Sequence, residues 1–201
     1  MSELSPMSES STAEVRQRLL TLLAERSYQR RRVILASGRE SDFYFDSKQT
    51  VLGAEGAWLT GRLFYRAIAE LPEFEELDAV GGMELGSVPI ASAIAVVSQL
   101  ASLSGAGRTL DQLIVRRAPK QHGTQAAVEG SPQVPAGSKV AVVEDVVTTG
   151  GSSLRAVRRL REEGYVVESL ITLIDRQEGG REAIEAEDLR LVSLFTKENF
   201  E

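Results

Sequence analysis

The sequence contains no cysteine among its 201 residues and only one histidine. The absence of cysteine excludes disulfide bonds, thiolate metal sites and a cysteine nucleophile, and it fits a reducing compartment. No apolar run reaches the length of about 20 residues that a membrane-spanning helix requires. The first residues, MSELSPMSESSTAEV, lack the basic segment and the apolar core of a secretory signal. We therefore expect a cytoplasmic protein.

Positive charge is in deficit over the chain as a whole. Lysine and arginine number 23 against 29 acidic residues, a formal net charge of −6, which argues against nonspecific nucleic-acid binding. An anionic ligand must therefore be bound by a local cluster of cations. With 42% hydrophobic and 26% charged residues, the composition is that of an ordinary globular protein with one buried core.

The two ends of the chain differ in organisation. Residues 1–12 are rich in Ser, Glu and Pro and are predicted to be a disordered tail, with Thr12 as the N-cap of the first helix. Residues 13–201 are predicted to form a single domain. Its small N-terminal subdomain comes largely from residues 13–60, and its core comes from residues 61–201.

Strand-like and helix-like segments alternate along this domain. Two short strands are expected around the turn-prone SGRESD at residues 37–42, followed by a helix over residues 53–71. The core then alternates between the two types: strands are expected at 77–82, 111–117, 139–145, 166–175 and 189–195, and helices at 87–103, 152–164 and 181–185. Apolar strands separated by helices predict an α/β fold with a parallel sheet covered on both faces.

The stretch VAVVEDVVTTGGS, residues 140–152, carries the clearest chemistry. Its apolar run predicts a buried strand that ends at Glu144 and Asp145, at the edge of the sheet where ligands bind. Adjacent carboxylates can accept hydrogen bonds from a vicinal diol such as that of ribose. The simpler alternative is a pair of solvated charges at a strand end beside a Gly-rich turn.

The loop that follows the acids has the composition of a phosphate site. Backbone N–H groups and hydroxyls at a helix N-terminus can together bind one phosphate. We expect Gly150 and Gly151 to adopt backbone conformations that a side chain would forbid, and Ser152 to cap the helix. Acids and loop together favour a site for a ribose 5-phosphate unit.

This stretch is similar to the phosphoribosyl pyrophosphate (PRPP) motif of type I phosphoribosyltransferases. The resemblance implies the fold of that family, a central parallel sheet flanked by helices with a small N-terminal hood. It also implies that the acids hold the ribose hydroxyls and the loop holds the 5-phosphate. The PRPP-binding residues implied by the family are Arg116, Arg117, Lys120, His122, Glu144, Asp145, Val146, Val147, Thr148, Thr149, Gly150, Gly151 and Ser152.

Further segments resemble orotate phosphoribosyltransferases rather than their purine relatives. SGRESDFYFD at residues 37–46 resembles a part of the hood over the base, and VRRAPKQHGT at residues 115–124 resembles the mobile catalytic loop. DRQEGG at residues 175–180 resembles the strand end whose arginine contacts the orotate carboxylate, and VGGMELGSVPIA at residues 80–91 also matches. The matches follow the family order over nearly the whole chain.

The loop at residues 115–124 concentrates positive charge in an acidic protein. A pyrophosphate leaving group gains negative charge as its bond breaks, and cations placed for that moment lower the barrier. The alternative is a solvated basic turn. The resemblance implies that the loop binds pyrophosphate and reaches into the neighbouring subunit, which makes the protein a homodimer with shared sites. The implied catalytic residues are Lys120, His122 and Asp145.

The acceptor side rests on one arginine and two aromatic residues. Arg176 ends an apolar strand, where a guanidinium can bind a carboxylate bidentately. A structural salt bridge to Asp175 or Glu178 is the alternative. The aromatic residues can line a flat base pocket or form the core of the hood. The orotate-binding residues implied by the resemblance are Thr148, Arg176, Tyr44 and Phe45.

Two positions depart from the family pattern. The family often has a lysine where this chain has Ala36, and some members have a lysine where it has Leu85. The missing cation can be supplied by Lys48, which resembles a basic residue of other members, or by Arg39.

The resemblance implies transfer of the 5-phosphoribosyl group from PRPP to orotate, which yields orotidine 5′-phosphate and pyrophosphate in pyrimidine biosynthesis. Magnesium is expected mainly on substrate oxygens, because the sequence shows no dedicated metal cage. No nucleic-acid or membrane partner is expected. The alternatives are a phosphoribosyltransferase for another base and a PRPP-binding regulator without turnover.

Overall fold

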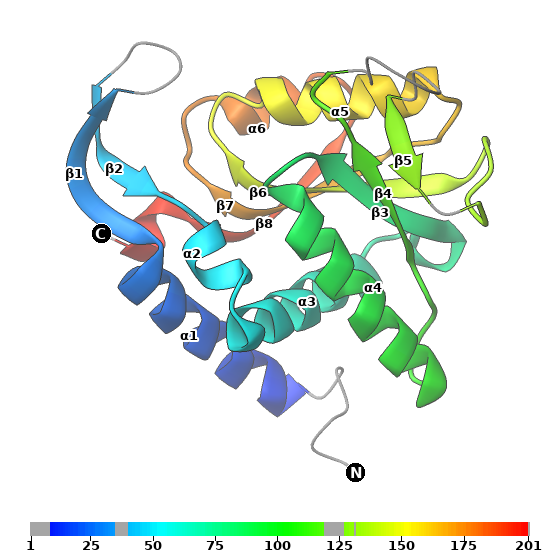
Figure 1. Cartoon of the computed structure of the whole chain (residues 1–201), viewed down its shortest axis with the longest axis horizontal. Coiled ribbons are helices and arrows are strands. Elements are labelled where there is room, and N and C mark those ends of the chain that lie inside the picture. Colours follow the sequence, from blue (N-terminus) through cyan, green and yellow to red (C-terminus); the bar gives the residue numbers. More distant parts are fainter. Residues whose placement is uncertain (1–8, 35–39, 119–126, 131, 201) are drawn as a thin grey trace.

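A computed structural model of the chain describes residues 9–34, 40–118, 127–130 and 132–200 (Figure 1). Residues 1–8 of the predicted tail lie outside this described part, as do the predicted site residues Lys120 and His122. Ala36 and Arg39 lie outside it as well. No helix within the described ranges has both the length and the apolarity needed to cross a membrane.

The core is one six-stranded sheet in the order β5-β4-β3-β6-β7-β8. Strands β4, β3, β6, β7 and β8 pair in parallel, which confirms the predicted sheet. Strand β5, which was not predicted, pairs antiparallel with β4 at the edge. The strands are β3 (Leu77–Met83), β4 (Asp111–Val115), β5 (Val128–Gly130), β6 (Lys139–Val147), β7 (Ser169–Asp175) and β8 (Arg190–Thr196).

Helices cover both faces of this sheet, as predicted (Figure 1). On one face α3 (Ala54–Ala69) and α4 (Ser87–Leu103) pack with Ala141 and Val143 of β6. On the other face α5 (Gly151–Glu162) and α6 (Gly180–Glu185) pack with Val140 and Val142. Because successive side chains of a strand point to opposite faces, β6 supplies both halves of the core.

The hood is formed by the N-terminal segment, which precedes the core in the chain. It contains α1 (Glu9–Arg26), the antiparallel strands β1 (Tyr28–Ile34) and β2 (Glu40–Phe45), and the short helix α2 (Lys48–Val51). Helix α1 begins at Glu9, so the prediction of Thr12 as its N-cap was wrong. The chain closes with a 3-10 helix, η3 (Lys197–Phe200), whose Phe200 ring lies 5.5 Å from that of Phe45 in β2.

Strand β6 differs from the prediction at its carboxyl end. It was expected to end at the two acids, but it continues to Val147. Val146 and Val147 pair with Ile174 and Asp175 of β7, so the ladder passes the acids. The two carboxylates therefore belong to a paired strand, and strand geometry decides where each one points.

Candidate active site

A cleft of about 490 Å³ opens at the carboxyl ends of β3 and β6, the edge at which parallel α/β sheets bind ligands. It brings the predicted acids together with the start of the basic loop and with the hood. The cleft is lined by Lys48, Met83, Glu84, Leu85, Gly86, Arg117, Glu144, Asp145 and Ser152.

Glu144 points to the α5 side of β6. Its side chain is buried, and it accepts a hydrogen bond of 3.0 Å from the Ser153 hydroxyl. Burial first, and then the charge of the neighbouring Asp145, raise the pKa of Glu144 to about 8. A group with this pKa holds its proton at neutral pH.

Asp145 points to the opposite side, toward α4 and the hood. The hydroxyl of Ser47 donates a hydrogen bond of 2.6 Å to its Oδ2 atom. Gly86 lies against the same carboxylate, because a Cβ atom added there would be only 2.5 Å from the Asp145 Cγ. Each acid is thus held by a different element, and both line the cleft. Their binding to one diol stays a prediction.

The phosphate loop connects β6 to α5. Gly150 is the N-cap of α5 and has a left-handed backbone with φ of 79°, which confirms the expectation for this glycine. Gly151 is instead the first helical residue, and Ser152 lies in the first turn and does not cap it, so both of those predictions were wrong. A second cleft of about 390 Å³ is lined by Val146, Thr148, Thr149, Gly150, Gly151, Ser152 and Arg155.

Val147 lines neither cleft, unlike the other predicted PRPP-binding residues of the stretch 144–152. Its side chain is buried in the core, and its carbonyl oxygen accepts a hydrogen bond of 2.9 Å from the backbone N–H of Arg176. The last residue of β6 thus contacts the segment that carries the acceptor arginine.

The two described arginines of the basic loop have different partners. Arg116 forms a salt bridge of 3.1 Å with Glu129 of β5. Arg117 lines the cleft, where its backbone N–H donates to Glu84 Oε1 at 2.8 Å and its Nε donates to the Glu84 carbonyl oxygen at 2.9 Å. Sequence reasoning missed Glu84, which anchors the start of the loop.

Arg176 follows β7 and is buried. Its Nη2 atom lies 2.9 Å from Glu178 Oε1, so the salt bridge weighed as the alternative is present, whereas Asp175 pairs with Arg181. Nη2 also donates to the Phe43 carbonyl oxygen at 3.3 Å, and the guanidinium lies 5.2 Å from the Phe43 ring. We call residues 175–180, which begin at the end of β7, the acceptor turn. Arg176 therefore connects the acceptor turn to the hood.

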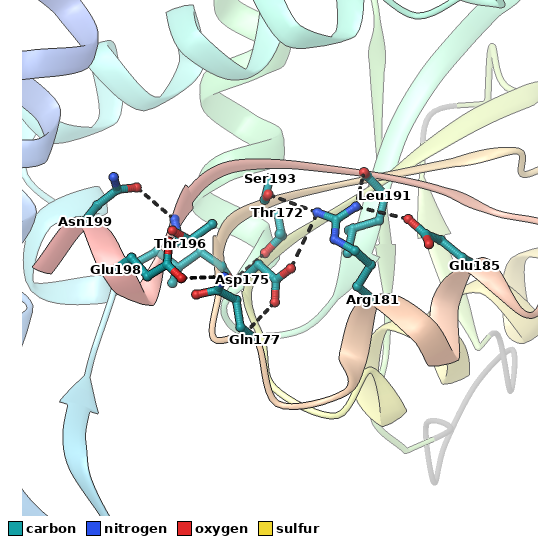
Figure 2. Close-up of polar contacts among 11 residues, drawn as sticks. Thr172, Asp175, Gln177, Arg181, Glu185, Leu191, Ser193, Thr196, Glu198 and Asn199 are labelled. Carbon is teal, nitrogen blue, oxygen red and sulfur yellow. Dashed lines mark hydrogen bonds and ion pairs between the residues drawn. The ribbon is translucent and has the colours of Figure 1, made fainter. Parts of the chain in front are cut away.

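The turn that carries Arg176 is fixed by the buried Asp175 (Figure 2). Asp175 accepts a hydrogen bond of 2.8 Å from the backbone N–H of Gln177, whose φ of 56° is in the left-handed region. Arg181 lies 3.5 Å from the other carboxylate oxygen of Asp175. Arg181 also contacts Glu185, the Leu191 carbonyl oxygen and the Ser193 hydroxyl.

This turn packs directly on the phosphate loop through Gly180. A Cβ atom added to Gly180 would lie 2.5 Å from Val147 Cγ1 and 2.7 Å from the Thr148 carbonyl oxygen. Only glycine permits this approach, so the acceptor turn and the phosphate loop are built as one unit.

The aromatic residues of β2 divide between its two faces. The rings of Phe43 and Phe45 stack 6.2 Å apart on the core side, whereas Tyr44 lies under the Arg31 guanidinium at 3.9 Å. Phe45 thus belongs to the core of the hood, and Phe43, which was not predicted, contacts Arg176. The alternation of a strand was the signal that separates Tyr44 from its neighbours.

Of the two departures from the family pattern, Leu85 lies in the described part of the chain and Ala36 lies outside it. Leu85 is exposed at the rim of the cleft. Lys48 lines the cleft and forms a salt bridge of 2.5 Å with Asp46, which raises the pKa of its ammonium group. Of the two proposed substitute cations, Lys48 is thus brought to the site.

Comparison with known proteins agrees with this geometry. The model of the family described as "Phosphoribosyl transferase domain" matches residues 59–199. An orotate phosphoribosyltransferase of Sorangium cellulosum is 49% identical over 188 residues, 94% of each chain. One of Synechocystis is 45% identical over 92% of this chain and 87% of its own.

Solved structures give the same result. The orotate phosphoribosyltransferase of Mycobacterium tuberculosis in complex with PRPP superposes with a TM-score of 0.73 and 35% identity, covering 92% of this chain and 98% of that one. An adenine phosphoribosyltransferase of Leishmania donovani, at 15% identity and a TM-score of 0.61, shares the fold. The chain belongs to the orotate phosphoribosyltransferase family.

Proposed function

We propose that the protein transfers the 5-phosphoribosyl group from PRPP to orotate, yielding orotidine 5′-phosphate and pyrophosphate in de novo pyrimidine biosynthesis. One observation carries the proposal: the phosphate loop of a PRPP site, which follows the two acids of β6, contacts a turn with a buried arginine through Gly180. Relatives named orotate phosphoribosyltransferase support the same reaction. The cytoplasmic location expected from the sequence stays a prediction.

The donor half is proposed to bind PRPP in two places. The 5-phosphate is expected in the loop of residues 148–152, because backbone N–H groups at the start of a helix such as α5 can bind an anion. The ribose hydroxyls lie at Asp145 and Glu144, which line the adjoining cleft. The oxygens of both carboxyl groups can accept hydrogen bonds from hydroxyls, so this arrangement orients the sugar between the two clefts.

The acceptor half is proposed to bind orotate at Arg176. A guanidinium can hold a carboxylate with two parallel hydrogen bonds, and a neutral purine offers no such group. Glu178 and the Phe43 carbonyl oxygen contact the same side chain and hold it in place. Thr148, Tyr44 and Phe45 stay predicted contacts of orotate.

Catalysis is proposed to come from orientation and charge. The anionic ring nitrogen of orotate needs no strong base, so the protein has to align it with the anomeric carbon. As the bond to pyrophosphate breaks, the ribosyl group gains positive charge and the leaving group gains negative charge. Arg117 and Lys48 line the cleft and can stabilise that leaving group, and Lys120 and His122 are predicted to join them.

Magnesium is proposed to bind together with PRPP. In the described ranges no cluster of three or more His, Cys, Asp or Glu side chains could hold a metal ion by itself. The carboxylate of Asp145 at the cleft fits an ion whose remaining ligands are substrate oxygens and water. Such an ion would neutralise part of the pyrophosphate charge.

We also propose a homodimer whose sites are shared through residues 116–124. Support comes from an apolar hollow of about 440 Å³ in which Leu52 is 68% and Val96 is 61% exposed. Exposed apolar patches of this kind mark protein interfaces. The hollow is lined by Val51, Leu52, Ala57, Trp58, Pro89, Ser92, Ala93, Val96 and Val97.

Subunit mixing tests the shared site. Lys120→Ala and Asp145→Ala proteins, each inactive alone, should regain about a quarter of the wild-type activity when mixed and allowed to exchange, because half of the dimers then contain one intact site. Each variant incubated with itself is the control. A mixture that exchanges subunits without regaining activity would argue against sharing.

The reaction itself is tested by substrate choice. Orotate depletion is measured with PRPP and magnesium, beside parallel assays with adenine, hypoxanthine and uracil. We expect turnover of orotate alone. Turnover of a purine or uracil without orotate would assign the protein to another base, and PRPP binding without any turnover would indicate a regulator.

A further inference from the structure

Ser47 connects the hood to the PRPP site. It lies between β2 and α2, its side chain is fully buried, and its hydroxyl donates to Asp145 Oδ2 at 2.6 Å. The two residues are 98 positions apart in the chain, so this contact is made only by the folded protein.

The hydroxyl of Ser47 does not cap helix α2, although Ser47 occupies the N-cap position. Ser47 is the N-cap residue of α2, a place where serine usually accepts a hydrogen bond from the helix. It makes no such side-chain bond, and Asp46 instead accepts a hydrogen bond of 3.2 Å from the backbone N–H of Lys48. The Ser47 hydroxyl is therefore directed at Asp145 rather than at its own helix.

Asp145 is held from two sides. Ser47 binds one carboxylate oxygen, and the backbone of Gly86 packs against the carboxylate, so closely that a Cβ atom there would lie 2.5 Å from Asp145 Oδ1. A side chain confined in this way keeps one orientation toward the cleft that it lines.

We propose that Ser47 is a positioning residue for the reaction: its hydroxyl fixes the Asp145 carboxylate in the orientation that accepts the ribose hydroxyl of PRPP. This inference rests on the proposed function. It makes the donor site depend on the hood, because Ser47 belongs to the hood and lies between β2 and α2. A displaced hood would therefore release the Asp145 carboxylate.

Ser27 provides a matched control. It is also a buried serine of the hood, and its hydroxyl forms a hydrogen bond of 2.7 Å with the Thr50 hydroxyl at the far end of α2. It does not line the cleft. Ser27→Ala and Ser47→Ala thus each remove one buried hydrogen bond from the same subdomain, but only Ser47→Ala removes one from Asp145.

Steady-state kinetics separate positioning from stability. Hydrogen bonds to charged groups are stronger than those between neutral groups, so Ser47→Ala should lower kcat/KM for PRPP by about tenfold or more. KM for orotate should stay within about twofold, and Ser27→Ala should leave both parameters near wild type at a similar loss of thermal stability. An equal effect of the two variants, or none, would overturn the proposal. Ser47→Cys, whose thiol is a weak donor, replaces Ser47→Ala if that variant folds poorly.

A double-mutant cycle tests whether Ser47 acts through Asp145. PRPP binding with magnesium is measured by calorimetry for wild type, Ser47→Ala, Asp145→Asn and the double variant. Ser47→Ala should weaken binding in the wild type and have little further effect beside Asp145→Asn. Equal weakening in both backgrounds would refute the inference. Binding is measured without orotate, so the result holds even if the wild type fails to turn orotate over.

Discussion

Replacing Glu144 by glutamine should make the protein more resistant to alkaline conditions. The buried Glu144 carboxyl has its pKa raised from 4.5 to about 8 by desolvation and by Asp145. Between these two values the folded protein binds a proton that the unfolded chain does not bind. A rise in pH therefore favours unfolding over this window.

The size of the effect follows from the two pKa values. One pKa unit corresponds to about 1.4 kcal/mol, so the raised pKa of Glu144 represents about 5 kcal/mol of stability. This stability is fully present below pH 4.5 and is lost as the pH rises through the folded pKa of about 8. Glutamine resembles the protonated carboxyl in shape and does not titrate, so Glu144→Gln should keep that stability.

The assay is urea unfolding of both proteins without ligand at pH values from 5 to 8.5 and constant salt. The free energy of unfolding of the variant should exceed that of the wild type by an amount that grows with pH, to several kcal/mol at the upper end. Glu55→Gln is the control, because the pKa of Glu55 is lowered by Arg18 and its charge does not change in this range. A difference between wild type and Glu144→Gln that is constant over pH would refute the reasoning.

Three further changes test the acceptor turn. Arg176→Lys keeps the charge but loses the bidentate geometry, so KM for orotate should rise by about tenfold or more while the calorimetric affinity for PRPP is unchanged; equal losses would contradict the assignment. Gly180→Ala places a Cβ atom 2.5 Å from Val147 Cγ1. Calorimetry should therefore show weaker PRPP binding, and thermal unfolding should show a lower Tm; unchanged values would show that the loop can shift. Arg181→Ala removes one partner of the buried Asp175. Urea unfolding should therefore show a free energy of unfolding lower by about 1–3 kcal/mol, and the KM for orotate should rise.

The sequence predicted those parts of the fold that depend on local pattern. The apolar segment at residues 87–103 coincides with α4 (Ser87–Leu103), and the alternating strands and helices gave the sheet with its helices on both faces. The left-handed Gly150 was also predictable, because a sharp turn from strand to helix requires such a residue. Periodicity and turn chemistry are properties of neighbouring residues, so they can be read from one chain.

The missed features depend on contacts between distant residues. The contact between Asp145 and Ser47 joins residues 98 positions apart, and that between Arg176 and Phe43 joins residues 133 positions apart. No local sequence pattern predicts either contact. The end of β6 was misplaced for the same reason: the strand was expected to end at the two acids, whereas pairing with β7 carries it past them. The raised pKa of Glu144 follows from the burial of its side chain, so it could not be predicted from the sequence either.

The position of the site between sheet and hood has a consequence for both substrates. Val147 and Asp175 pair across β6 and β7, so the phosphate loop and the turn of Arg176 leave the sheet side by side and pack through Gly180. The hood contacts both halves, with Ser47 on Asp145 and the Phe43 carbonyl oxygen on Arg176. A change confined to one of these contacts should therefore affect PRPP or orotate separately, whereas a change that displaces the whole hood should impair both together.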